Sequence, residues 1–143
     1  MGRALGIDYG EKRVGLALSD KSSLIASPYI TLQYSSEDDL ISKIKNIVSD
    51  KEIKIFVIGL PLNMKGNDSA QTKKVRKFKK LLSGLEFPII YEDERFSSTI
   101  AKNSLVLQNV KTGHNKSEVD RTAAAIILQQ YLDKNSNWNL YSI

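Results

Sequence analysis

The fold is decided by the stretch Arg3-Ala-Leu-Gly-Ile-Asp-Tyr-Gly-Glu-Lys-Arg-Val-Gly-Leu-Ala-Leu-Ser19. It predicts two strands, at residues 3–8 and 13–19, joined by a turn at residues 9–12. In the second strand Val, Leu and Leu alternate with Gly, Ala and Ser, which is the period-2 pattern of a half-buried strand. A third strand is predicted at residues 27–33. We therefore expect the chain to begin with an antiparallel meander.

Beyond the meander, the apolar residues change to helical spacing and then alternate between helix and strand. Ser35 or Ser36 is suited to cap a helix whose apolar residues run from Leu40 to Val48. The remaining predictions are strands at 53–58 and 88–91, helices at 69–82, about 97–108 and 117–132, and a mobile loop at 109–116. Gly84 is expected to end the helix at 69–82. Helical crossovers require parallel neighbours, so we predict an α/β fold with a five-stranded mixed sheet. Its antiparallel three-strand meander is joined by two parallel strands, and helices cover both faces.

Size and composition favour a small intracellular protein. The 143 residues suggest one domain, at residues 1–134, followed by a polar tail at 135–143. The absence of cysteine excludes disulfides and Cys-ligated zinc. No apolar run is long enough for a signal peptide or a membrane span, so we expect a cytoplasmic protein without membrane contact. The net charge of +5 favours polyanionic partners.

Two acidic residues stand at positions that need an explanation. Asp8 ends the first strand, and Gly6 on the same strand face leaves room beside it for a metal or a phosphate. An ordinary turn aspartate is the alternative. Asp120 shares a helix face with Ala123, Ala124, Ile127 and Tyr131, so it points inward and has to be paired or metal-bound. The alternative for Asp120 is an interaction with the helix dipole.

A third acidic group, Glu92-Asp93-Glu94, follows the fifth strand. Mutual repulsion of three acids is relieved by a divalent cation or by Arg95, and a solvated strand end is the alternative. Strand alternation turns Asp93 and Glu94 in opposite directions, so only one of them is expected to face Asp8. Asn63 follows the fourth strand, at the end where open α/β sheets bind ligands, although its loop could be only a turn.

Six basic residues fall between Lys73 and Lys80. A solvated helix face is the usual meaning of such a run, and a phosphate-binding patch is the alternative. His114 is the only histidine, so a zinc site is not expected.

In these motifs the chain resembles the YqgF/RuvX family of bacterial Holliday-junction resolvase-like nucleases, also described as nucleases for the 5′ end of pre-16S rRNA. The matching motifs are Gly6-Ile-Asp-Tyr-Gly10 with Arg13 to Asp20, Gly59-Leu-Pro-Leu-Asn-Met64 with Gly66, Asp93-Glu-Arg95, and Lys116 to Gln129. The chain departs from the family pattern at Lys65, where aspartate is common, and at Phe96-Ser-Ser, where Leu-Thr-Thr is commoner.

The resemblance implies a ribonuclease H-like fold and a nuclease site that binds Mg²⁺ or Mn²⁺, with two ions expected. Its metal ligands and catalytic residues would be Asp8, Glu94 and Asp120. Arg13, Asn63, Lys65, Arg95, Lys116 and Arg121 are the candidates for binding the substrate. The implied partner is nucleic acid, either pre-rRNA on the ribosomal small-subunit precursor or branched DNA, bound by a monomer or a homodimer.

Two other functions are compatible with parts of this pattern. A sugar-kinase or actin-type ATPase also has a Gly-Ile-Asp-x-Gly strand, but it needs a second lobe for which 143 residues leave no room. A ribosome-assembly factor that binds nucleic acid without cleaving it would retain the fold. Cleavage tests with an Asp8 variant separate that binder from an enzyme.

Overall fold

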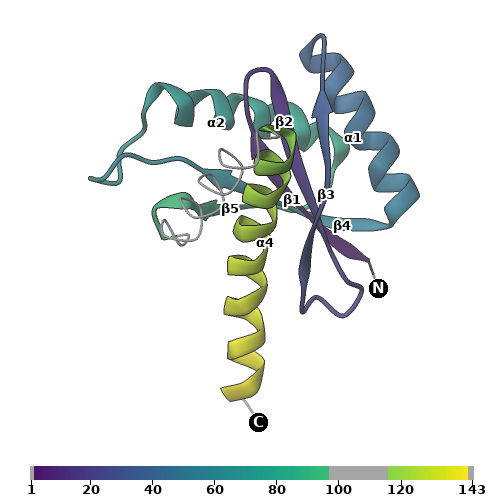
Figure 1. The fold of residues 1–143 in the computed structure, drawn as a ribbon, viewed down its shortest axis with the longest axis vertical. Coiled ribbons are helices and arrows are strands. Elements are labelled where there is room, and N and C mark those ends of the chain that lie inside the picture. The colour runs from purple at the N-terminus through teal and green to yellow at the C-terminus, as the bar shows by residue number, and fades with distance from the viewer. Residues whose placement is uncertain (1, 97–115, 142–143) are drawn as a thin grey trace.

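The chain folds around one mixed sheet with the strand order β3-β2-β1-β4-β5, as the computed structural model of residues 2–96 and 116–141 shows (Figure 1). The strands are β1 (Arg3–Tyr9), β2 (Arg13–Ser19), β3 (Ala26–Gln33), β4 (Ile53–Leu60) and β5 (Ile89–Asp93). β2 is antiparallel to β1 and β3, whereas β4 is parallel to β1 and β5. The predicted five-stranded mixed sheet is confirmed.

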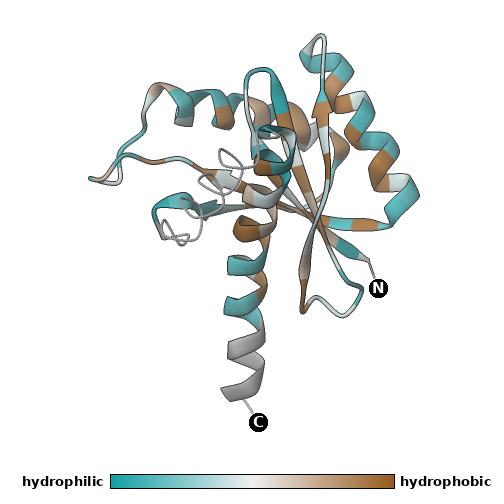
Figure 2. Cartoon of the chain, viewed as in Figure 1, coloured by the Kyte–Doolittle hydropathy of each residue, from teal (hydrophilic) through white to brown (hydrophobic). Residues whose placement is uncertain are grey.

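Helices cover both faces of this sheet (Figure 1). They are α1 (Glu37–Lys51), α2 (Ala70–Leu82) and α4 (Lys116–Tyr141), with short 3-10 turns η1 (Ser83–Leu85) and η2 (Glu94–Phe96). Large apolar side chains of α1 and α2, such as Leu40 and Phe78, pack with Leu5, Ile7 and Phe56 on one face. Apolar residues concentrate on the strands and on the helix sides that face them (Figure 2).

The face under α4 is built from much smaller residues. Ala4, Ala17 and Val57 contact Ala124, Ile127 and Leu128 of the helix. Small side chains allow the helix backbone to approach the strands closely. As a result β2 is buried on both faces, with Ala17 at 0% and Ser19 at 2% exposure, and the prediction of a half-buried strand was wrong. The face of β2 that carries Gly15, Ala17 and Ser19 has only small residues because α4 packs directly on it.

Two predicted boundaries also differ from the structure. Gly84 does not end α2; the helix tightens into η1, and Glu86 takes the left-handed conformation with φ 63°. The last helix continues past the predicted Leu132 to Tyr141, because residues 133–141 contain neither glycine nor proline to interrupt it. The predicted helix at 97–108 and most of the loop at 109–116 lie outside the described residues. Within the described residues, no helix is long and apolar enough to span a bilayer.

Candidate active site

The candidate site lies at the edge of the sheet where the parallel strands β1, β4 and β5 end. Asp8 is the penultimate residue of β1, and Glu94 directly follows β5. β2 runs the opposite way, so its first residue, Arg13, lies at the same edge. The start of α4 is held there too, because the Thr31 hydroxyl donates to the Ser117 carbonyl at 2.5 Å. This edge therefore collects all the predicted site residues: Asp8, Arg13, Asn63, Lys65, Glu94, Arg95, Lys116, Asp120 and Arg121.

Three glycines surround Asp8 on the face that α4 covers. Gly6 lies two residues earlier on the same face, Gly15 is the cross-strand partner of Asp8, and Gly59 follows the residue that pairs with Ile7. A methyl group on Gly15 would lie 2.1 Å from the backbone oxygen of Asp120. One on Gly59 would lie 2.5 Å from the carboxylate Oε1 of Glu94. Asp120 and Glu94 thus approach the two strands that flank Asp8.

Asp120 forms an ion pair across the sheet edge. The Arg13 Nε donates to Asp120 Oδ2 at 2.7 Å, and the two side chains are 31% and 24% exposed. The prediction that Asp120 points inward agrees with this arrangement, since Ala124 and Ile127 on the same helix face are buried. Arginine is a cation of the kind that a carboxylate binds when no metal ion is near. Asp120 is therefore satisfied in the described structure by Arg13.

The structure distinguishes Glu94 from its neighbour Asp93. Asp93 receives hydrogen bonds from the Arg95 side chain, at 3.1 Å from Nε and 2.8 Å from Nη2 to Oδ2. The Arg95 guanidinium holds the pKa of the Asp93 carboxyl below its usual value. Glu94, in contrast, reaches over Gly59 toward Ile127 of α4. Of the two neighbours, Glu94 is the one whose carboxylate lies on the side of the sheet that Asp8 faces.

The loop between β4 and α2 borders the same edge. The Asn63 Oδ1 accepts backbone hydrogen bonds from Lys65 and Asn67, both at 3.0 Å, so this side chain shapes its own loop. Lys65 is exposed. A methyl group on Gly66, which has φ 85°, would lie 3.3 Å from Nη1 of Arg95, which places the Arg95 guanidinium against the loop. Lys65 and Arg95 therefore bring two cationic side chains to this edge.

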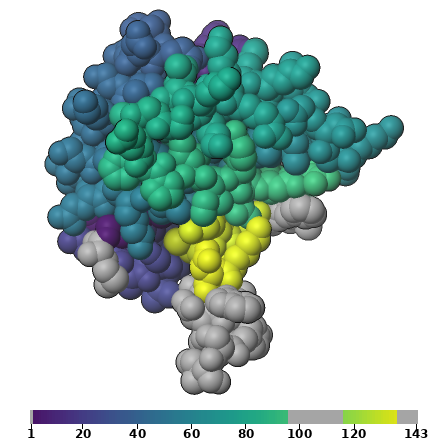
Figure 3. All heavy atoms as spheres, turned by 180° about the vertical axis from the view of Figure 1, so that it is seen from behind, coloured from purple at the N-terminus to yellow at the C-terminus, as the bar shows by residue number. Residues whose placement is uncertain are grey.

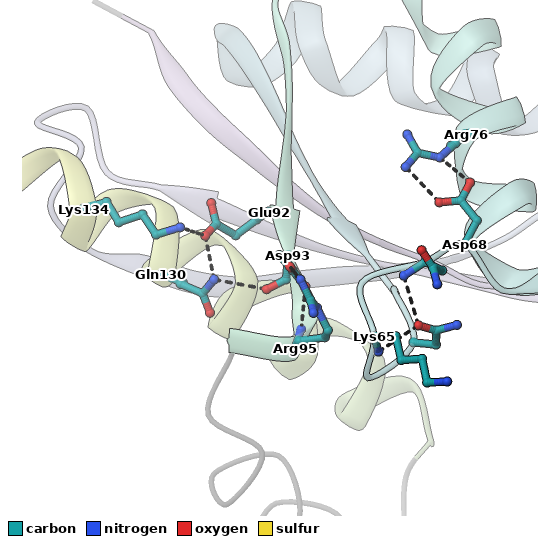
Figure 4. A network of polar contacts seen from close by, with 10 residues as sticks. Lys65, Asp68, Arg76, Glu92, Asp93, Arg95, Gln130 and Lys134 are labelled. Atoms are coloured by element: carbon teal, nitrogen blue, oxygen red, sulfur yellow. Dashed lines mark hydrogen bonds and ion pairs between the residues drawn. The ribbon is translucent and has the colours of Figure 1, made fainter.

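Glu92 is a buried carboxylate that the sequence interpretation assigned to a solvated strand end. It is only 4% exposed and accepts a hydrogen bond from Gln130 Nε2 at 2.6 Å (Figure 4). Lys134, also on α4, forms an ion pair with the same oxygen. Gln130 donates in addition to the Asp93 carbonyl at 3.3 Å. Glu92 thus connects α4, which carries Asp120, to β5, which leads into Glu94. No signal in the sequence links position 92 to positions 130 and 134.

Replacing Glu92 with alanine is expected to lower the free energy of unfolding by about 1–3 kcal/mol, because a buried hydrogen-bond network loses its acceptor. Urea unfolding followed by circular dichroism measures the change. Glu86, an exposed glutamate, is the matched control, and Glu86→Ala is expected to stay within about 0.5 kcal/mol of wild type. Equal effects of the two substitutions would show that the Glu92 contacts do not stabilise α4.

The chemistry of this edge suits a hard cation. Asp8, Glu94 and Asp120 supply carboxylate oxygens, the ligands that Mg²⁺ and Mn²⁺ prefer. Among residues 2–96 and 116–141, no three acidic, histidine or cysteine side chains are already arranged around one point. The Asp120 carboxylate is turned to Arg13. The donor set fits a divalent ion in its chemistry.

Comparisons with known proteins agree with this architecture. A profile of the RuvX family, described as "Holliday junction resolvase", matches residues 2–134. A protein of Crocosphaera subtropica named "Putative pre-16S rRNA nuclease" is 45% identical over 132 residues, 92% of each chain. A protein of the same name from Dictyoglomus thermophilum is 37% identical over 135 residues, which cover 94% of this chain and 97% of the relative.

Solved structures show the same fold at much lower identity. "T. thermophilus RuvC in complex with Holliday junction substrate" superposes with a TM-score of 0.61 at 12% identity, covering 95% of this chain and 96% of that chain. A second, "Thermus thermophilus RuvC structure", has a TM-score of 0.58. The predicted ribonuclease H-like fold and the predicted family are both confirmed, and nuclease is the function class that the family and its relatives share. The chain belongs to the RuvX family.

Proposed function

We propose that this protein is a divalent-metal-dependent nuclease whose metal ligands and catalytic residues are Asp8, Glu94 and Asp120. The observation that carries the proposal is the approach of the Glu94 carboxylate and of the Asp120 backbone to the glycines on either side of Asp8. Carboxylates that are brought together at one point repel one another unless a cation lies among them. Membership of a family of nucleases supports the same activity.

Hydrolysis of a phosphodiester adds a water oxygen to phosphorus and breaks the bond to the leaving oxygen, which takes up a proton. When bound, two Mg²⁺ or Mn²⁺ ions activate the water and neutralise the leaving oxygen. Asp8 would hold these ions together with Glu94 and Asp120, which approach the strands on either side of it. The three carboxylates would hold the ions and orient them toward the substrate. Gly6 and Gly15 are buried beneath α4, and this close packing fixes the position of the β1 and β2 backbone beside Asp8.

The cationic residues of the edge are assigned to the substrate phosphates. Arg13, once released from Asp120, presents a guanidinium beside the carboxylates, and Arg95 and Lys65 extend the positive charge along the loop. Lys116 is exposed and Arg121 half-buried at the start of α4, where both lie near the same edge. Asn63 supports this group indirectly, by holding the backbone of the Lys65 loop.

For the substrate we propose the 5′ end of pre-16S rRNA, processed in the cytoplasm on the small-subunit precursor. Relatives that carry this substrate in their names are 37–45% identical over most of the chain, whereas the junction-bound RuvC is 12% identical. The alternative is a Holliday junction, which the family description favours. A symmetric junction calls for a dimer with two sites related by a two-fold axis, and a ribosomal precursor does not. A factor that binds RNA without cleaving it is the second alternative.

Cleavage of two substrates by one preparation tests the proposal. An RNA that spans the 5′ boundary of 16S rRNA is expected to be cut in the presence of Mg²⁺ or Mn²⁺ and to stay intact in EDTA. A four-way DNA junction is expected to be cut more slowly. Depletion in the source cell should leave 16S rRNA with extended 5′ ends. Junction cleavage together with normal 16S ends would favour the resolvase, and no cleavage of either substrate would favour the binding factor.

A further inference from the structure

Helix α2 concentrates positive charge in a way that its own stability does not explain. Six of its thirteen residues are Lys or Arg, and none is Asp or Glu. Several of these cations are three or four positions apart, as Arg76 is from Lys79 and Lys80, and like charges at that spacing oppose helix formation. Buried Val75, Phe78 and Leu82 hold the helix against the sheet and leave the charged side outside. A helix that tolerates such repulsion is suited to an anionic partner.

Four of these cations border a groove between α2 and the edge strand β5. α2 packs on the face of the sheet opposite α4, and its atoms are exposed in the view of Figure 3. The groove has a volume of about 450 Å³ and is lined by Arg76, Lys77, Lys79, Lys80, Ser83 and Tyr91. Arg76 and Lys79 each lie 5.4 Å from the centre of the Tyr91 ring. Arg76 also donates to both oxygens of Asp68, at 2.7 and 3.0 Å. The ring and the carboxylate position two cations in advance of any ligand.

The positive charge of this groove is largely uncompensated. Some lysines outside the groove have acidic partners, such as Asp39 for Lys43 and Glu11 for Lys74. In the part of the chain that the structure describes, no carboxylate forms an ion pair with Lys77, Lys79 or Lys80. Three unpaired ammonium groups beside a fixed guanidinium attract a chain of phosphates more strongly than they attract a single anion.

The groove lies close to the candidate site along β5. Tyr91 lies three residues before Glu94, a distance of about 10 Å along an extended strand. β5 is the outer strand of the sheet, so a bound polymer can pass around it from one face to the other. The Arg76–Asp68 pair ties α2 to the loop that carries Lys65, which links the groove to the cations of the site.

We propose that this groove binds the phosphate backbone of the nucleic-acid strand a few nucleotides from the bond that is cut. The proposal rests on the proposed nuclease function and extends it with a second contact surface on the substrate. Lysine contacts to phosphate do not distinguish one base from another. The groove therefore increases the affinity for the strand and fixes its orientation on the protein. The occupant is a single flexible strand, because it has to bend around the edge of the sheet.

The test is an anisotropy titration of a labelled single-stranded RNA in EDTA, where cleavage does not interfere. The variant K77A/K79A/K80A is compared with K21A/K45A/K54A, which removes three exposed lysines near the amino ends of β1 and β4. The groove variant is expected to bind at least about tenfold more weakly at moderate salt. The slope of log affinity against log salt should fall by about 2, at about 0.7 for each lost phosphate contact. The control variant should bind like wild type.

Folding and activity are read separately. Because the substitutions remove like charges from α2, the melting temperature of the groove variant should rise by about 3 °C. Weaker RNA binding by this variant then cannot be attributed to unfolding. On a long RNA the groove variant should raise KM and leave kcat unchanged. Equal RNA binding by wild type, the groove variant and the control variant overturns the proposal. It is also overturned if the groove variant loses binding only to vesicles of anionic phospholipid and not to RNA. If wild type binds RNA through the groove but cuts nothing, the groove is supported and the nuclease function fails.

Discussion

Replacing Asp8 with asparagine is expected to reduce metal-dependent cleavage by about a thousandfold or more while the protein remains folded. Asparagine keeps the size of the side chain and one acceptor oxygen, but it removes the negative charge that a shared metal ligand needs. Losing that ligand costs several kcal/mol of transition-state stabilisation, and each 1.36 kcal/mol corresponds to about a tenfold change in rate. Initial rates of RNA cleavage at saturating Mg²⁺ measure the loss.

Asp50→Asn is the matched control, because the same chemical change then falls on an exposed residue near the end of α1. It should cleave like wild type. Circular dichroism and urea unfolding show whether both variants are folded. An Asp8→Asn protein that retains more than about a tenth of wild-type activity in a clean preparation contradicts the assignment of the metal site.

The largest effect on stability is expected at Gly15, where even one methyl group meets a backbone. An alanine Cβ would lie 2.1 Å from the carbonyl oxygen and 2.3 Å from the carbonyl carbon of Asp120. Backbone cannot rotate aside as a side chain can, so α4 has to move away from β2. We expect Gly15→Ala to lower the free energy of unfolding by about 3 kcal/mol or more. Because Asp120 moves with the helix, the folded fraction should also lose cleavage activity.

Gly84 provides the control for this substitution. A methyl group there has no neighbour within 4 Å, and the backbone is not in the left-handed region. Gly84→Ala should therefore change the stability by less than about 1 kcal/mol, with a small gain expected from the unfolded state. Urea unfolding of both variants in parallel separates the two cases. Similar stabilities would mean that α4 does not approach β2 as closely as the structure describes.

The order of the elements was predictable because each change of period in the apolar residues marks a change of structure. Period 2 at Val14 to Leu18, helical spacing from Leu40 and the apolar run at Ile53 identify strand, helix and buried strand in turn. The inward position of Asp120 followed from the same reasoning, since one helix face carries it with Ala124 and Ile127. Local sequence patterns are sufficient to predict a structural feature when neighbouring residues in the chain determine that feature.

The contacts around the site were not predictable, because they join positions far apart in the chain. Gly15 is small because Asp120 lies on it, and Glu92 is buried because Gln130 and Lys134 donate to it. The ion pair of Arg13 with Asp120 joins positions 107 residues apart. Arg13 had been predicted as a phosphate ligand, and the structure adds a second role for it as the partner of an acid. Tertiary packing decides such contacts, and no spacing in the sequence records them.

In the proposed site, Asp8, Glu94 and Asp120 together hold the divalent ions. The most direct measurement is anomalous diffraction from crystals of the protein soaked in Mn²⁺, which locates the metal without reference to activity. Mn²⁺ density is expected within about 2.3 Å of carboxylate oxygens of all three residues, with the Arg13–Asp120 ion pair broken. Mn²⁺ bound elsewhere, or no density at an ion concentration that supports cleavage, would contradict it.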